Sequence, residues 1–490
     1  MKLRRQSQHH HESRQGFVLL AILVFIFLLS MLTVSLLFRS QGEETATAAS
    51  SGSEQAWSAA MSGVEVALEI AKGATPGSFD WQDNPSLFRQ RPVYEDGADQ
   101  WYFTVYSPSG SDALVEVRYG LSDTAGRLNL NHPGRSDLAK VPRFTQAMLD
   151  SFHQYMNGSS SGGASSLLLS STLEPGVEDS APGFTLGAKT GARQLATLDE
   201  LLMIQGFTGT LLHGEDANMN GRLDANEDDG DETYPPDNHD GRLDHGLAQY
   251  FTVESYDPNR SDAGTSRYNL NDPKAEWPAG DFPAGFSNYV ASLRAAKQRV
   301  GGVADVLEAV AHLKNEQGID VEIASGITKE ELPRVMDLFT TDDEGRHDGL
   351  LNINTASATV LATLPDVDAA LAETIVSTRT AISPERRGNI AWLYQEGVVD
   401  AARFKSLAPS LTARSYQFHF QVIGYGLPSG RYRVLEVAID VAGAQSRVTY
   451  LRDITRLGLP FALKAENALP AGEGASLHRR RLPTLTRTHG

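Results

Sequence analysis

The chain has 490 residues, no cysteine and a formal net charge of −18. This length is sufficient for two or three domains with hydrophobic cores of their own. The lack of cysteine excludes a disulfide framework and thiolate chemistry, and the acidic balance argues against a nucleic-acid-binding protein, which needs a basic surface.

An apolar stretch near the amino terminus runs from Phe17 to Phe38 without a charged residue. As a helix it would be about 33 Å long, which is enough to cross the hydrocarbon core of a bilayer. A secretory signal peptide would have a shorter apolar run with a small-residue cleavage site after it, whereas Gly16 precedes this run. Basic residues before the run hold that end in the cytoplasm and predict a single-pass anchor with the bulk of the chain in the periplasm: Lys2, Arg4, Arg5 and Arg14.

The boundary between Gly16 and Phe17 resembles the type IV prepilin and pseudopilin signal, in which a short basic leader ends in glycine before an uncharged helix. The resemblance implies that residues 1–16 are a leader, that a membrane prepilin peptidase cuts after Gly16, and that Phe17 is then methylated. The alternative is an ordinary anchor with a chance Gly-Phe boundary.

One position departs from the common pattern of that family. Most pilins and pseudopilins have a glutamate at the fifth residue of the mature chain, where this sequence has Ala21. A carboxylate inside the membrane is costly and needs a partner, which in the family is taken to be the amino group of the subunit ahead. The member that lacks this glutamate is the large minor pseudopilin K of type II secretion, so the resemblance implies that Ala21 places the subunit at the filament tip.

The pattern beyond the membrane predicts one continuous helix over residues 17–73, ended by Gly73 and Pro76. Apolar residues recur at three- and four-residue spacing on one face of it: Trp57, Ala60, Met61, Val64, Leu68 and Ala71. Alternating or branched apolar residues predict strands further on, at 101–106, 114–121, 416–424, 431–441 and 448–451.

These elements predict an α+β protein with a pilin-like long helix packed on an antiparallel sheet. Because the strands lie at both ends of the soluble region, a large, mostly helical insert has to separate them. The expected segments are the sheet's first part at 74–126, a helical insert with calcium loops at 127–350, a degenerate helix-hairpin-helix at 351–413, closing strands at 414–455 and a disordered tail at 456–490.

The insert contains three short segments that echo one another, at 127–131, 267–271 and 350–354, each with the pattern Asn-x-Asn. Asparagine forms turns and caps helices, so the echo predicts where each helical subdomain begins. Helices are expected at 138–156 and 287–314. The serine- and glycine-rich stretch 158–166 nominally matches a hydrolase nucleophile elbow, but its composition is that of a linker.

The segment from Asp216 to Glu227 matches every position of the EF-hand calcium-loop template. Gly221 permits the sharp turn, Arg222 offers its carbonyl, and Glu227 can close the shell with both oxygens. We therefore predict a bound Ca2+ ion, against the alternative of a solvated acidic loop. The oxygen-bearing side chains at the remaining ligand positions are Asp216, Asn218, Asn220 and Asp224.

A partial second copy follows, with Pro236 and Leu247 at the first and last positions, so a second calcium site there has to borrow ligands. Candidates for borrowing are Asp237 or the run Asp228, Asp229 and Asp231. Nearby His213, His239 and His245 do not have the spacing of a zinc ligand set and are expected to be bystanders. The copy's own ligand positions hold Asn238, Asp240, Arg242 and Asp244.

The sequence after residue 351 resembles a helix-hairpin-helix, with helices expected at 357–361 and 369–379. In the DNA-binding version the hairpin carries glycines whose amides face a phosphate, but here those places hold Asp366 and Asp368, which would repel one. A degenerate hairpin opened by an Asn-Thr-Ala phrase is a recurring feature of pseudopilin K. Asp366 and Asp368 therefore argue against a DNA-uptake protein.

Together, the leader without the glutamate, the insert with calcium loops and the degenerate hairpin resemble minor pseudopilin K of type II secretion. The resemblance implies a structural subunit that starts or caps the pseudopilus, and not an enzyme. Its implied partners are the other minor pseudopilins at the tip, the prepilin peptidase and the inner membrane, with no nucleic acid. The alternative is a membrane-anchored periplasmic hydrolase, for which no catalytic constellation stands in a plausible context.

Overall fold

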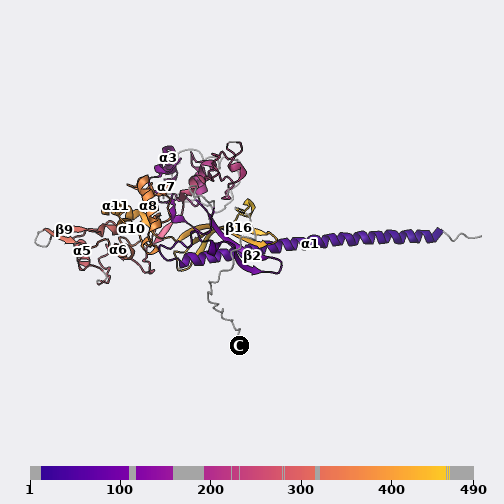
Figure 1. The fold of residues 1–490 in the computed structure, drawn as a ribbon, viewed down its shortest axis with the longest axis horizontal. Coiled ribbons are helices and arrows are strands. Elements are labelled where there is room, and N and C mark those ends of the chain that lie inside the picture. Colours follow the sequence, from indigo (N-terminus) through magenta and orange to yellow (C-terminus); the bar gives the residue numbers. More distant parts are fainter. Residues whose placement is uncertain are drawn as a thin grey trace, which may run out of the picture.

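The computed structural model describes residues 13–109, 117–157, 193–221, 223–230, 232–278, 280, 282–314, 320–459, 461 and 463. The basic residues before Ser13, the linker 158–166 and most of the predicted tail lie outside this range. Helix α1 (Ser13–Gly73) extends from the body of the molecule, and its amino-terminal half projects alone (Figure 1). The helix ends at Gly73, as the sequence predicts.

The main sheet is antiparallel and combines strands from both ends of the chain. Its order is β1-β2-β15-β16-β17, with β3 beside β2 and β4 beside β15. Val105 of β2 lies opposite Val422 of β15, which confirms that strands more than 300 residues apart are neighbours in one sheet. The strands are β1 (Arg91–Glu95), β2 (Gln100–Pro108), β3 (Val117–Arg118), β4 (Ser122–Asp123), β15 (Gln417–Leu427), β16 (Tyr432–Asp440) and β17 (Arg447–Asp453).

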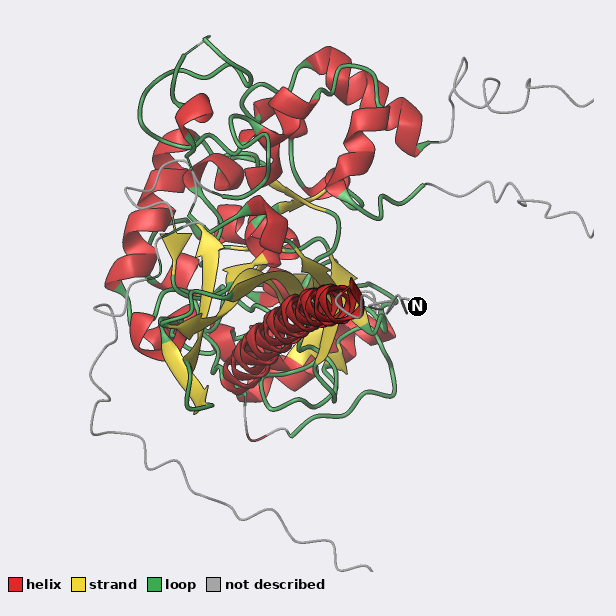
Figure 2. Ribbon diagram, turned by 90° about the vertical axis from the view of Figure 1, so that its right-hand side faces the viewer, coloured by secondary structure: helices red, strands yellow, loops and turns green. Residues whose placement is uncertain are grey.

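The second half of α1 lies across this sheet (Figure 2). The contact is centred on small residues, because a side chain at Gly424 would bring its Cβ to 2.1 Å from the Ala56 carbonyl oxygen and 2.3 Å from the Ala60 nitrogen. The prediction of an apolar face on α1 is therefore confirmed in part, since Ala60, Val64 and Ala71 are buried. Its larger members Trp57 and Met61 are only partly buried and flank the contact.

The opposite face of the sheet is covered by the chain that follows β17. Leu457, Leu459 and Phe461 pack against a cluster that includes Tyr106 and Tyr425. The ring centroids of Tyr106 and Phe461 are 5.6 Å apart in an edge-to-face arrangement. The described residues just after 456 are therefore not disordered as predicted, because these partly buried apolar side chains pack on the sheet.

Three pairs of two-residue parallel strands organise the insert. Each Asn-x-Asn segment begins one pair, and the partner strand closes it: β5 (Leu128–Asn129) with β6 (Phe251–Thr252), β8 (Tyr268–Asn269) with β11 (Phe339–Thr340), and β13 (Leu351–Asn352) with β14 (Leu411–Thr412). We call the enclosed ranges the first unit (128–253), the second unit (268–341) and the third unit (351–413). The echo in the sequence therefore does mark the start of each unit.

The second asparagine of each segment connects the start of its unit to two later parts of the same unit by hydrogen bonds. The Asn131 amide donates to the carbonyls of Leu195 and Val253, at 2.9 and 2.8 Å. Asn271 donates in the same way to Val300 and Thr341, and Asn354 to Arg387 and Ala413. The asparagines are turn formers, as expected, but they do not cap helices. The α-helix caps with a side-chain hydrogen bond in the first and third units are Thr145, Thr208, Ser357, Asp368 and Asp400.

Short helices separated by turns fill the units, so the prediction of a mostly helical insert is wrong for the described residues. The first unit has α3 (Gln146–Met156) and α4 (Gly209–His213), and the second has α5 (Ala284–Ala295) and α6 (Leu332–Leu338). The third has α7 (Ala358–Leu361), α8 (Ala369–Ala381), α9 (Pro384–Arg387), α10 (Trp392–Gln395) and α11 (Ala401–Leu407).

Three predicted elements differ from the structure. The helix expected at 138–156 begins only at Gln146, because Pro142 interrupts it and Thr145 caps the new start. The helix expected at 287–314 ends at Ala295, and Val310–Lys314 forms strand β9, paired with β10 (Asp320–Ala324). Of the strand expected at 114–121, residues 114–116 lie outside the described range and only Val117–Arg118 is extended in a ladder.

Two hydrophobic cores support the units. One core is shared by the first and third units and includes Phe152, Phe251, Trp392 and Phe404, all fully buried. The other belongs to the second unit and is built around Phe286 and Phe339. The second unit, with α5, α6 and β9, lies at the end of the molecule opposite the projecting half of α1 (Figure 1).

Candidate metal centre

The predicted calcium loop begins just after α4 and folds around its first ligand. The two Asp216 carboxylate oxygens accept hydrogen bonds from the backbone N–H groups of Asn220 and Gly221, at 2.9 and 3.0 Å. Gly221 has φ +68°, a left-handed conformation that favours glycine, as the template requires. The Asn218 side-chain oxygen accepts a second bond from Asn220 N–H, at 2.9 Å.

The remaining predicted ligands are linked to one another through hydrogen bonds to Asp224. The side-chain amides of Asn218 and Asn220 donate to one Asp224 carboxylate oxygen, at 2.9 and 2.8 Å. Glu227 accepts a bond from Asp224 N–H at 3.0 Å through one oxygen. Its side chain is only 1% exposed, and its other oxygen is buried without a hydrogen-bond partner among the described residues.

Burial makes these carboxylates hard to ionise without a cation. It raises the pKa of Asp216 to about 6 and that of Glu227 to about 7, and the charge of Asp224 adds to both effects. A bound cation would reverse this repulsion and would give the buried Glu227 oxygen a partner. The two asparagine amides, turned by half a rotation, would present oxygens instead of nitrogens.

The donors of this first loop suit a hard cation. They are carboxylate, amide and backbone oxygens, which is the ligand type that Ca2+ takes. The backbone carbonyl expected from Arg222 lies outside the described residues. The donor types of Asp216, Asn218, Asn220, Asp224 and Glu227 fit the predicted ion. The carboxylate oxygens of Asp216, Asp224 and Glu227 do not all lie within 4.8 Å of one another, however, unlike the ligand atoms of Asp228, Asp237 and His239.

The second loop is organised by a residue that the calcium-loop template does not include. Glu215, which is 6% exposed, accepts bonds from the backbone N–H groups of Asn238 and Asp244 at 3.3 and 3.0 Å. Burial raises the pKa of its carboxyl. Glu215 directly precedes Asp216 in the chain, so one carboxylate holds the second loop and its neighbour holds the first. The only sign in the sequence of this role of Glu215 was its position next to another acidic residue.

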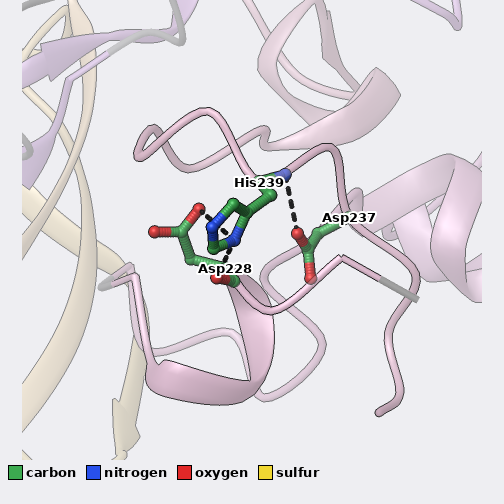
Figure 3. A group of neighbouring side chains, drawn as sticks. All are labelled: Asp228, Asp237 and His239. Atoms are coloured by element: carbon green, nitrogen blue, oxygen red, sulfur yellow. Dashed lines mark hydrogen bonds and ion pairs between the residues drawn. The ribbon is translucent and has the colours of Figure 1, made fainter. Parts of the chain in front are cut away.

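A cluster in the second loop includes the residues considered for borrowing. Each of Asp228, Asp237 and His239 offers a ligand atom within 4.8 Å of the other two (Figure 3). Asp237 accepts bonds from the backbone of Asp229 and Gly230, at 3.1 and 2.8 Å, which folds the run of aspartates toward it. His239, expected to be a bystander, therefore lies within ligand distance of both carboxylates. Asp231 lies outside the described residues.

Other predicted ligands of the second loop have different partners. Asn238 accepts a bond from the Asp240 backbone at 2.9 Å, and Asp240 accepts one from the Arg242 backbone at the same distance. Asp244 forms an ion pair with Arg143. Asp240 and Asp244 are not members of the Asp228–Asp237–His239 cluster. The histidines His213 and His245 lie beside Asp199 and Asp216, at 3.3 and 4.0 Å.

The residues of the predicted processing site lie on α1. Gly16 and Phe17 are in its first turns, and Ala21 is exposed. From Leu19 to Glu44 the helix is long and apolar enough to span a membrane, and no residue of its most apolar window is buried. This is the one such helix among the described residues.

The hairpin region has the two predicted helices, α7 and α8. Asp366 adopts a left-handed conformation at φ +58°. Asp368 caps α8 and accepts a hydrogen bond from Leu371 N–H at 2.8 Å. This carboxylate occupies the helix N-terminus, the place where an anion would otherwise bind.

No protein-family model matches the chain, and no curated protein matches it.

Proposed function

We propose that the chain is a minor pseudopilin similar to pseudopilin K of type II secretion, and that it acts as a structural subunit and not as an enzyme. The observation that carries this proposal is the division of α1 into two halves. The apolar half is exposed over its whole surface, whereas the other half packs on a sheet made from both ends of the chain. In this proposal one helix is both the membrane anchor and part of the hydrophobic core beneath the main sheet.

The proposed location follows from this helix. Its apolar half would lie in the inner membrane, with the sheet and the three units in the periplasm. The prepilin peptidase would remove residues 1–16 and leave Phe17 as the methylated amino terminus. A subunit without a glutamate at Ala21 would have nothing to pair with an amino group ahead of it, which suits a place at the filament tip.

The proposed partners are the other minor pseudopilins. The exposed apolar surface of α1 would contact lipid before assembly and the equivalent helices of neighbouring subunits afterwards. The units would extend from the tip, since they lie at the end of the molecule away from the projecting helix. In this position they would start or cap the filament that exports folded proteins across the outer membrane.

We also propose that Ca2+ serves this subunit as a folding element. The first loop gathers buried carboxylates that repel one another, and its oxygens are of the type that calcium takes. Binding energy would then add to the stability of the folded first unit. The second loop, with Glu215, Asp228 and Asp237, offers oxygens for a second ion.

The decisive experiment is the intact mass of the full chain extracted from membranes of a strain with a prepilin peptidase. We expect a mature protein that begins at methylated Phe17. Gly16→Leu should keep the leader. The matched control is Gly42→Leu, on the same helix at a position where an added Cβ would meet no atom within 4 Å, and it should still be processed. A parent protein that retains residues 1–16 would instead identify an ordinary membrane anchor.

A further inference from the structure

We propose that the loop joining β11 to β12 (Arg346–Asp348) binds a zinc-type divalent ion through Asp342, Glu344 and His347. We call residues 342–348 the 342–348 loop. Each of the three side chains offers a ligand atom, and these atoms all lie within 4.8 Å of one another. The Nε2 of His347 is 3.9 Å from the Oδ1 of Asp342. This proposal stands independently of the proposed function.

A buried amide beside the cluster supplies a second observation. Asn259 is 9% exposed, and its side-chain nitrogen lies 2.8 Å from the Glu344 carbonyl and 3.5 Å from Asp342 Oδ1. The oxygen of the same amide is buried and has no hydrogen-bond partner among the described residues. A buried polar atom of this kind requires a partner. The contacts toward the cluster are made by the amide nitrogen, so an ion held by Asp342 would lie beside a buried amide whose oxygen still lacks a partner.

The sequence of the loop explains why the ion would differ from calcium. Residues 342–348 repeat the spacing Asn/Asp-x-Asn/Asp/Glu-Gly-Arg-x-Asp of residues 218–224 and 238–244. In those two loops the residue before the last aspartate is leucine, whereas here it is His347. Calcium takes oxygen ligands, while an imidazole with two carboxylates suits zinc and similar transition-metal ions.

The backbone of the 342–348 loop also differs from the backbone of the first and second loops. Gly221 and Gly241 have φ values of +68° and +74°, which bend the first two loops into the calcium turn. Gly345 does not have a positive φ, and the chain after it pairs with β7 (Tyr256–Pro258). His347 lies opposite Asp257 in this pairing. His347 therefore lies on strand β12, whose partner is β7, whereas β11 pairs with β8.

The position of the cluster leaves room for further ligands. Asp342 and His347 line a cavity of about 280 Å3 between the second and third units. Glu344 is not among the residues that line this cavity, so an ion held at its edge by Asp342 and His347 would keep a coordination position for water on the cavity side, as in open zinc sites. An ion here would lie next to the junction at which Asp257 contacts Arg414, which directly follows the third unit.

The test is a zinc titration of the full-length protein in detergent, against a chromogenic chelator. Excess Ca2+ is kept present so that the oxygen loops are filled. We expect His347→Ala and Asp342→Asn each to weaken the binding of one zinc ion per chain by tenfold or more. Two controls separate other sites: His239→Ala tests the Asp228–Asp237–His239 cluster, and His312→Ala removes an exposed histidine beside Glu322, at 3.4 Å.

Cobalt provides a second readout. The parent protein loaded with Co2+ should show a visible absorption band that His347→Ala lacks and His312→Ala keeps. Thermal unfolding without metal establishes that each variant is folded. If folded His347→Ala and Asp342→Asn bind zinc as tightly as the parent, or if His239→Ala removes all zinc binding, the 342–348 loop is not a metal site.

Discussion

Arg414 and Asp257 form a buried ion pair, with side chains only 7% and 6% exposed. The Arg414 Nε atom also lies 3.2 Å from the second Asp257 oxygen, so the guanidinium engages both oxygens. The same guanidinium donates to the Arg260 carbonyl at 2.8 Å. Because Arg414 follows β14 and Asp257 lies in β7, the pair joins the third unit to the segment between the first and second units.

Arg414→Ala should destabilise the protein by about 3–5 kcal/mol, because it leaves the Asp257 charge buried without its partner. The measurement is the free energy of unfolding in denaturant. Arg386→Ala in the third unit is the matched control, since it removes an ion pair to Glu396 from an arginine that is 56% exposed. That variant should lose less than about 1 kcal/mol. Equal losses from the two variants would contradict the role given to the buried pair.

Asn271→Asp should open the second unit. The substitution keeps the oxygen that accepts from Val300 N–H, but removes the amide donor to the carbonyls of Val300 and Thr341. A half-buried carboxylate facing two carbonyls should lower the free energy of unfolding by about 2–4 kcal/mol. Asn84→Asp is the control, because that side chain accepts a bond from Ser86. The exchange rate of the Val300 backbone amide hydrogen should increase in Asn271→Asp and not in Asn84→Asp. An unchanged rate in Asn271→Asp would show that the hydrogen bonds of Asn271 do not hold the unit together.

Gly424→Ala should weaken the packing of α1 on the sheet. The new Cβ would lie 2.1 Å from the Ala56 carbonyl oxygen, and this contact is to backbone, so the helix has to move away. We expect a drop in melting temperature and faster proteolysis near residue 56. Gly134→Ala, where no atom lies within 4 Å, should change neither measurement. A Gly424→Ala protein as stable as the parent would show that the helix adapts without cost.

Calcium should raise the melting temperature of the protein and protect the first loop from proteases, while magnesium should do so poorly. Glu227→Ala should remove most of this effect, because Glu227 closes the predicted shell. Asp244→Ala should remove only part of it, since Asp244 is paired with Arg143. Glu232→Gln, an exposed position in the same region, is the control. If chelation changes neither melting nor proteolysis, the loop is only a solvated acidic turn.

The metal-free protein should lose stability as pH rises. In the folded state the pKa of Glu227 is raised from 4.5 to about 7, and that of Asp216 from 3.8 to about 6. The folded state therefore keeps protons that the unfolded chain releases, so this stabilisation is full below about pH 4 and is lost by about pH 7. Glu227→Gln should flatten the dependence, which melting curves in chelator across this range would measure. A metal-free parent that becomes more stable between pH 5 and about 7 would contradict these shifts.

Ala21→Glu should impair secretion while leaving expression unchanged. Glutamate is a good helix former, so α1 itself should tolerate the change, but a carboxylate at a filament tip would have no amino group ahead to pair with. Ile22→Glu, one residue along on a different face of α1, controls for the added charge in the membrane. Incorporation of Ala21→Glu along the whole filament, with normal secretion, would show that this residue does not set the tip position.

The sequence alone determined the features that are local. A run of apolar residues from Phe17, periodic apolar residues up to Gly73 and alternating strands near both ends were sufficient to predict α1 and the main sheet. The spacing from Asp216 to Glu227 predicted the left-handed turn at Gly221, because the conformation of one short loop is set by the turn itself. Calcium binding by this loop stays a prediction. The three Asn-x-Asn segments likewise predicted where the units begin.

Only the tertiary structure decided what depends on contacts between distant residues. The parallel pairs join strands separated by many residues, and a two-residue strand has no periodicity of its own to recognise. Glu215, His347 and Arg414 acquire their surroundings from segments far away along the chain. The same holds for Leu457 and Phe461, whose apolar side chains are ordered because the sheet offers them a face to cover, a driving force that composition cannot reveal.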